Sequence, residues 1–153
     1  MSDLIQLLHV MTAAIWFGGQ VYVEGIMATA AKTKDPVVIM TVGGKVGQTS
    51  LRLFTVAGVL VFLSGIFMVL DSSRAWQFEM LFVSLGFVLA ILVMTLGVFY
   101  FKPKGLELRE IIQEHGLTSD LAMAKAKQIG NISHAATLLL TIALIVMVLK
   151  PGI

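Results

Sequence analysis

The stretch that decides the fold runs from Met80 to Phe101 and reads MLFVSLGFVLAILVMTLGVFYF. It has no charged residue, and as a helix rising 1.5 Å per residue it is long enough to cross roughly 30 Å of hydrocarbon. Similar apolar runs cover residues 4–31, 51–70 and 132–149. A backbone in lipid must satisfy its own hydrogen bonds, and no alternating barrel pattern is present, so the sequence predicts four transmembrane helices.

The composition of the whole chain supports this prediction. Of 153 residues, 58% are hydrophobic and 13% are charged, whereas a soluble domain has roughly 45–50% apolar and 25% charged residues. The mean hydropathy is +0.93. We therefore expect one membrane domain, residues 1–153, whose main partner is the lipid bilayer. A net charge of +2 is too small to indicate nucleic-acid binding.

The positions of the basic residues predict an orientation. Those of the first and third connectors are Lys32, Lys34, Lys45, Arg52, Lys102, Lys104, Arg109, Lys125 and Lys127. By contrast, the second connector has only Arg74 and the tails have only Lys150. The positive-inside rule then places connectors one and three in the cytoplasm and both termini outside. The predicted fold is an all-α, up-down-up-down bundle, N-out and C-out, in the cell's inner membrane.

Local signals refine the connectors. Residues 102–130 alternate apolar and charged side chains, so we expect a cytoplasmic helical hairpin with Gly116 at its turn and a helix start at Thr118–Asp120. Asp35 and Pro36 resemble an N-cap followed by proline at the first helical position. Small residues should line helix contacts in the second and third spans: these are Gly58, Gly65, Gly86, Ala90 and Gly97.

Polar residues inside a span are costly and are functional hypotheses by default. At 100° per residue, one stripe of the first span holds all of its main candidates within an arc of about 60°. The stripe comprises His9, Ala13, Trp16, Gln20 and Glu24. We expect it to face the bundle interior, with His9 near the outer surface and Glu24 near the inner surface.

Glu24 and His134 should lie at similar depth near the cytoplasmic boundary, because the two spans run in opposite directions. They are candidate partners of each other. A structural pair, one step of a proton path that also includes Gln20, and a cofactor ligand at His134 are the alternatives. His9 and His134 occupy opposite leaflets, so they should not share a haem.

The absence of cysteine excludes disulfides, thiolate sites, iron–sulfur clusters and covalently attached haem. Any metal or cofactor must be held by histidine, methionine, carboxylate or backbone. A haem on His9 would be five-coordinate or would take Met68 or Met80 as its second ligand. His9 with Met11, Met68 or Met80 is also a candidate copper site. Met147 points about 140° away from the His134 face of its helix, so it should not join them.

The segment His9–Tyr22, HVMTAAIWFGGQVY, resembles the first span of a membrane superfamily. That superfamily contains CopD-type copper resistance proteins, HemJ-type protoporphyrinogen oxidases and related four-helix proteins. The closing residues 146–152, VMVLKPG, are similar to the ends of CopD-like chains. The resemblance implies that His9 binds haem b, with Trp16 and Tyr22 nearby, or that His9 handles copper.

Two departures place the chain closer to CopD-like or uncharacterised members. HemJ-type proteins continue into Tyr-x-Pro-Arg, whereas this chain has Tyr22-Val-Glu-Gly25. They also carry a lysine shortly after a tryptophan, whereas here Trp76 is followed by Gln-Phe-Glu-Met80. Both missing cations are suited to pairing with porphyrin propionates, so porphyrinogen oxidation is not expected.

Three functions remain as hypotheses. The first is an integral membrane haem b protein in electron transfer or redox chemistry, with a membrane or soluble redox partner. The second is a CopD-like copper-handling protein. The third is a non-enzymatic membrane subunit or scaffold, for which a second copy of the chain is one candidate partner. Whether the chain is an enzyme is left open.

Overall fold

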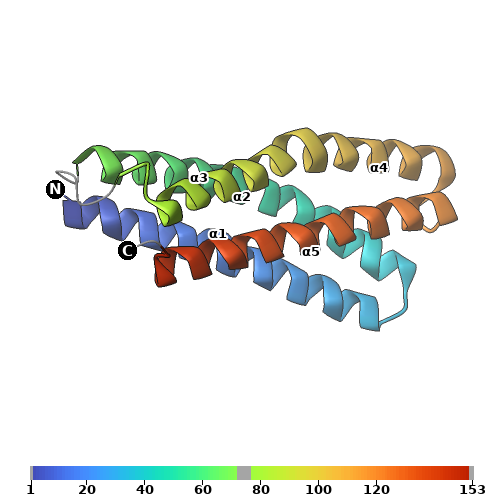
Figure 1. Ribbon diagram of the computed structural model, residues 1–153. Helices are drawn as coiled ribbons and strands as arrows, with labels where there is room; N and C mark the ends of the chain where they lie inside the picture. The colour runs from blue at the N-terminus through green and yellow to red at the C-terminus, as the bar shows by residue number, and fades with distance from the viewer. Residues whose placement is uncertain (1, 72–76, 152–153) are drawn as a thin grey trace.

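The computed structural model describes residues 2–71 and 77–151, so Arg74 and Trp76 lie outside the described residues. Within these ranges the regular structure is entirely helical. The elements are α1 (Ser2–Lys32), α2 (Pro36–Asp71), α3 (Leu81–Thr95), η1 (Leu96–Phe101), α4 (Lys102–His115) and α5 (Asp120–Leu149). Because α3, η1 and α4 follow one another directly, the chain runs along the long axis of the molecule four times (Figure 1).

The predicted all-α membrane bundle is confirmed. Each of the four rods is long and apolar enough to cross a bilayer, and the start of α1 and the end of α5 lie at the same end of the molecule (Figure 1). Two helices extend beyond the apolar runs 51–70 and 132–149, as the connector signals predicted. α2 begins at Pro36 and α5 begins at Asp120.

Local signals in the sequence set the helix ends. The Asp35 carboxylate accepts a hydrogen bond of 2.8 Å from the backbone N–H of Val37, so the predicted cap before Pro36 is confirmed. The Ser119 hydroxyl accepts a bond of 3.3 Å from the N–H of Ala122 and caps α5. Gly116, in the turn between α4 and α5, ends α4 with φ of 89°, which glycine adopts without steric cost.

The third rod contains a π-helix, η1, for which the sequence offered no prediction. Here the backbone N–H of Lys102 donates to the carbonyl of Gly97, five residues earlier. Pro103 has no N–H and cannot donate to the carbonyl of Phe99, as an α-helix would require. The missing donor accounts for the wider turn at this point of the rod.

Small side chains bring the helices together around Trp16. The core cluster contains Trp16, Ala57, Val93, Ala136 and Leu140, one or two residues from each rod. A Cβ on Gly58 would lie 3.1 Å from the Trp16 ring, so this glycine lets α1 and α2 approach closely. The expectation for Gly97 is wrong, because a Cβ there would meet nothing within 4 Å.

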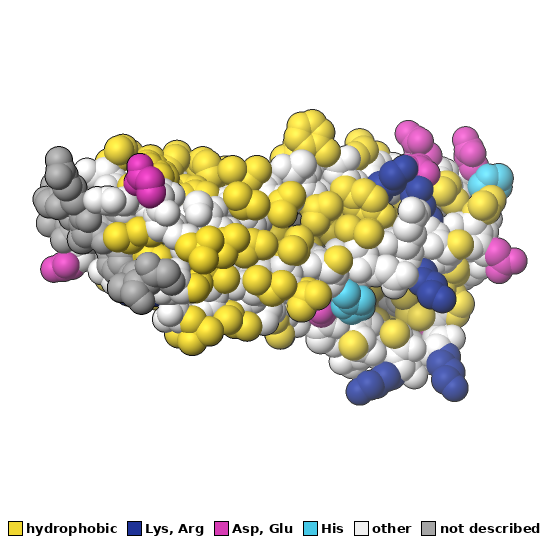
Figure 2. All heavy atoms as spheres, viewed as in Figure 1, with side chains coloured by type: hydrophobic (Ala, Val, Ile, Leu, Met, Phe, Trp, Pro, Cys, Tyr) yellow, Lys and Arg dark blue, Asp and Glu magenta, His cyan; other side chains and the backbone are white. Residues whose placement is uncertain are grey.

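Large apolar side chains cover the outside of the bundle. Examples from each rod are Leu4, Phe67, Phe99 and Val148, which are between 56% and 77% exposed. Figure 2 shows this apolar surface over much of the face in view, with lysine and arginine gathered at the end where α4 turns into α5. The chain is thus an integral, multi-pass membrane protein. By the positive-inside rule, this is the end that we predict to be cytoplasmic.

Candidate functional site: an apolar cavity beside His9

The ring of His9 is held by α2. Its Nδ1 lies 3.0 Å from the carbonyl oxygen of Val61 and 3.0 Å from the hydroxyl oxygen of Ser64. The Ser64 hydroxyl donates its own proton to the carbonyl of Leu60 at 2.6 Å. Since a carbonyl only accepts, Nδ1 of His9 must carry the proton and donate it. In the neutral ring, Nε2 is then the atom with a free lone pair.

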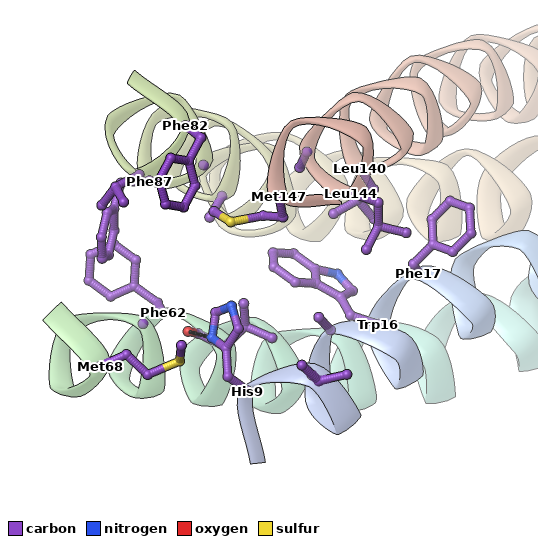
Figure 3. A pocket seen from close by; sticks show the side chains of 18 of the residues that line it. His9, Trp16, Phe17, Phe62, Met68, Phe82, Phe87, Leu140, Leu144 and Met147 are labelled. Carbon is purple, nitrogen blue, oxygen red and sulfur yellow. Dashed lines mark hydrogen bonds between the residues drawn. The ribbon is translucent and has the colours of Figure 1, made fainter. Parts of the chain in front are cut away.

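The Nε2 edge of His9 faces an apolar cavity of about 210 Å³. Side chains from α1, α2, α3 and α5 line it, all from the half of the bundle that the orientation predicts to be outer. Figure 3 shows His9 on one wall, Trp16 at the inner end, and Phe82 and Phe87 opposite and beside them. The cavity is partly open to the surface of the molecule. A single nitrogen donor among aromatic walls suits a flat, apolar ligand with a metal centre.

Two glycines widen the cavity. A Cβ on Gly65 of α2 would lie 3.4 Å from Cε1 of His9 and 3.5 Å from the Phe87 ring. A Cβ on Gly86 of α3 would lie 1.8 Å from the terminal methyl carbon of Met147. Both contacts confirm the predicted role of these small residues at helix interfaces.

The methionines divide differently from the prediction. Met68 and Met147 line the cavity with His9, whereas Met80 is not among its lining residues. The expectation for Met147 is wrong because the face of α5 that packs inward carries Ala136 and Leu140, which are 2% and 6% exposed. His134 lies on the other side of α5, with 68% of its side chain exposed. Met147, opposite His134 on the helix, therefore points inward.

The stripe on α1 faces inward as predicted. Trp16 is 5% exposed and Gln20 is 7% exposed, and the side chain of Glu24 is 21% exposed. Tyr22 differs, because it is 71% exposed and lies away from the cavity. Among the three proposed cofactor-binding residues, the structure thus brings only His9 and Trp16 together.

A second polar site joins α1 to α5 on the other side of Trp16. Gln20 donates to the hydroxyl of Ser133 at 2.9 Å, and the Glu24 carboxylate lies 3.1 Å from Nδ1 of His134. Thr137 donates to the other carboxylate oxygen of Glu24. The predicted proximity of Glu24 and His134 is confirmed. None of these residues lines the cavity, so the stripe serves two separate polar sites.

Ser133 and Thr137 were not among the predicted site residues. A signal was present, since both lie on the helical face that runs from Ser133 through Thr137 to Thr141, each four residues apart. Ser64 was also overlooked, although a serine within an apolar span commonly hydrogen-bonds a neighbouring helix.

The residues around the cavity fit a haem b better than a bare ion held by charged ligands. Among the described residues, no group of three His, Cys, Asp or Glu side chains could hold a metal. A metal-binding histidine usually donates its other ring nitrogen to a carbonyl, as His9 does. Lys150 adds a cation to the cavity lining, suited to a propionate.

Comparison with known proteins adds no assignment: no protein-family model, curated protein or solved structure matches this chain.

Proposed function

We propose that this protein is an integral membrane haem b protein that uses His9 as an axial ligand and acts in electron transfer or redox chemistry. The observation that supports this proposal most directly is the fixed orientation of the His9 ring. Val61 and Ser64 bind its Nδ1, so Nε2 is presented to the cavity in the form that coordinates iron.

The aromatic and apolar walls support the same proposal. A bound haem would exchange single electrons, and the low polarity of its surroundings would help to set its potential. Trp16 would close the inner end of the cavity and Lys150 would lie toward its outer end, because Trp16 is midway along α1 and Lys150 follows the last residue of α5. The redox partner would then be approached from the outer leaflet.

Copper handling is the second candidate function. The observation in its favour is that Met68 and Met147 line the same cavity as His9. Thioether sulfur and imidazole nitrogen are suitable ligands for Cu(I). In this alternative Met80, which lies outside the cavity lining, would take no part.

The visible spectrum and metal content of the protein, purified from haem-replete cells, test the proposal. We expect a Soret band in the wild type and its loss in His9→Ala. His115→Ala is the matched control, because it removes an exposed imidazole from the end of α4 and should leave the band unchanged. His134→Ala tests the alternative ligand at the inner site.

The outcomes separate the candidates. If the wild-type protein is purified from the membranes of haem-replete cells and shows no Soret band, the haem proposal is overturned. Stoichiometric copper that is lost in Met68→Leu and in His9→Ala would establish copper handling instead. Equal haem content in His9→Ala and the wild type would show that His9 is not the ligand.

A further inference from the structure

The cavity offers more than one sulfur atom to a metal bound at His9, and their positions are not equivalent. Met68 belongs to α2, the helix whose Val61 and Ser64 bind the His9 ring. Met147 belongs to α5 and lies across the cavity from His9, whereas Met68 lies beside it (Figure 3). The third sequence candidate, Met80, is not among the lining residues.

Axial ligands must approach a haem iron from opposite faces of the macrocycle. A side chain that lies next to His9 shares its face, so Met68 is badly placed for the second axial position. Met147 approaches from the opposing wall and meets this requirement. Trp16, also in Figure 3, closes the inner end and offers no metal ligand.

The side chain of Met147 packs into the space that Gly86 leaves free. Its terminal methyl carbon lies where a Cβ of residue 86 would be, 1.8 Å from that position, and its sulfur lies 3.5 Å from it. Any larger residue than Gly86 would force the Met147 side chain elsewhere. Methionine has three rotatable bonds and adapts to irregular space, so a rotation about these bonds would carry the sulfur from Gly86 toward the centre of the cavity.

From this geometry we propose that Sδ of Met147 is the second axial ligand of the haem bound by His9. The proposal depends on the function proposed above. It assigns a six-coordinate His–Met site, with one ligand from the first transmembrane helix and one from the last. Such ligation raises the reduction potential relative to a site without the thioether.

The test compares Met147→Leu with Met68→Leu and Met80→Leu in the purified, haem-loaded protein. Leucine keeps the apolar volume and removes only the sulfur. In the wild type we expect low-spin ferric haem with the weak near-infrared band of thioether ligation. Met147→Leu should lose that band, become high-spin, show a lower reduction potential and bind carbon monoxide faster. The other two variants should retain the wild-type spectrum.

Met147→His is a second variant that keeps the proposal open to refutation if Met147→Leu does not fold. It should restore the low-spin state without the thioether band, at a lower potential than the wild type. A haem-containing Met147→Leu or Met147→His with the unchanged near-infrared band overturns this proposal alone. A wild-type protein without haem overturns the proposed function together with it.

Discussion

Single glycines decide how closely the helices approach the site. Gly58 receives the edge of the Trp16 indole, and Gly86 receives the end of Met147. Other glycines of the same helices have open space around them, as Gly47 of α2 shows. A glycine shapes the packing around the cavity only where an added Cβ would meet a neighbouring side chain.

Replacing Gly58 by alanine should therefore lower the free energy of unfolding, whereas replacing Gly47 by alanine should raise it. A Cβ on Gly58 would lie 3.1 Å from Trp16 and 3.3 Å from Met94, so Gly58→Ala should destabilise the bundle by about 1–3 kcal/mol through overpacking. Gly47→Ala meets nothing within 4 Å and should stabilise it by up to about 1 kcal/mol. Reversible unfolding in mixed micelles measures both.

Indole fluorescence supplies a local check on the same two variants. The chain has two tryptophans, so a Trp76→Phe background reports Trp16 alone. Its emission should shift in Gly58→Ala and not in Gly47→Ala. Equal stability of the two variants would show that the Trp16 contact does not limit packing.

The directions in which side chains point could be predicted from the sequence where helical periodicity determines them. His9, Trp16, Gln20 and Glu24 share one face of α1, and all four face inward or half inward. The prediction failed for Met147, because all of α5 is apolar near this residue and its sequence does not reveal which face is buried. The sequence could not indicate that Met80 lies outside the cavity lining, because proximity in depth does not specify the side of the bundle toward which a side chain points.

At the scale of elements, the hairpin of α4 and α5 is joined by one carboxylate. Glu107 of α4 forms an ion pair of 2.7 Å with Lys104 on the same helix and a second pair with Lys125 of α5. The side chain of Lys125 is 12% exposed, so this pair lies between the helices. Hydrogen bonds from Lys104 and Lys125 lower the pKa of Glu107 below its ordinary value of 4.5.

The lowered pKa predicts an acid-sensitive hairpin. Because the folded form binds the proton less readily, Glu107 stabilises the hairpin above pH about 4.5, and this contribution is lost as the pH falls through the lower folded pKa. Amide hydrogen exchange in α4 should accelerate over that interval, and high salt should weaken the effect because the side chain of Glu107 is 41% exposed.

Two variants isolate this contribution. Glu107→Gln should remove the acid-dependent part of the exchange rate. Glu110→Gln, a change of the same kind at an exposed position of α4, should retain it. If both variants kept the wild-type pH profile, another group would be responsible for it.

Element boundaries could be predicted where polar residues mark them. Asp35 and Ser119 each accept a hydrogen bond at the start of a helix, and Gly116 supplies the backbone conformation that ends one. The extension of α2 upstream of Leu51 was expected from Pro36, whereas η1 was not. A proline near a helix start is usually benign, and only the continuous rod reveals that Pro103 lies within a longer helix.

At the scale of the whole molecule, the hydropathy pattern was sufficient for the fold. Four apolar rods with a common axis follow from the length of each run and from the need to satisfy backbone hydrogen bonds in lipid. The separation into an outer cavity and an inner polar site could not be predicted, because it depends on which residues of α2 and α5 meet the stripe on α1.

The orientation of the bundle can be measured directly, because the chain has no cysteine. Gln77→Cys lies just before α3, and Thr118→Cys lies between α4 and α5. A membrane-impermeant maleimide should label Gln77→Cys in intact cells and Thr118→Cys only after permeabilisation. Leu138→Cys, on an exposed apolar face of α5, is the control that should resist labelling in both cases.

The reverse labelling pattern would place both termini inside. It would also move the His9 cavity to the cytoplasmic leaflet and change the side from which a redox partner approaches.

The wide turn in the third rod sets the angle between its two halves. An α-helix advances about 100° per residue, so removing one residue from 96–101 to restore ordinary winding would rotate α4 by about that amount about its axis. Glu107 would turn away from Lys125, while the part of α3 that lines the cavity would keep its place. One extra residue in a turn thus acts as an angular spacer between the membrane-embedded half of the rod and the half that carries its charges.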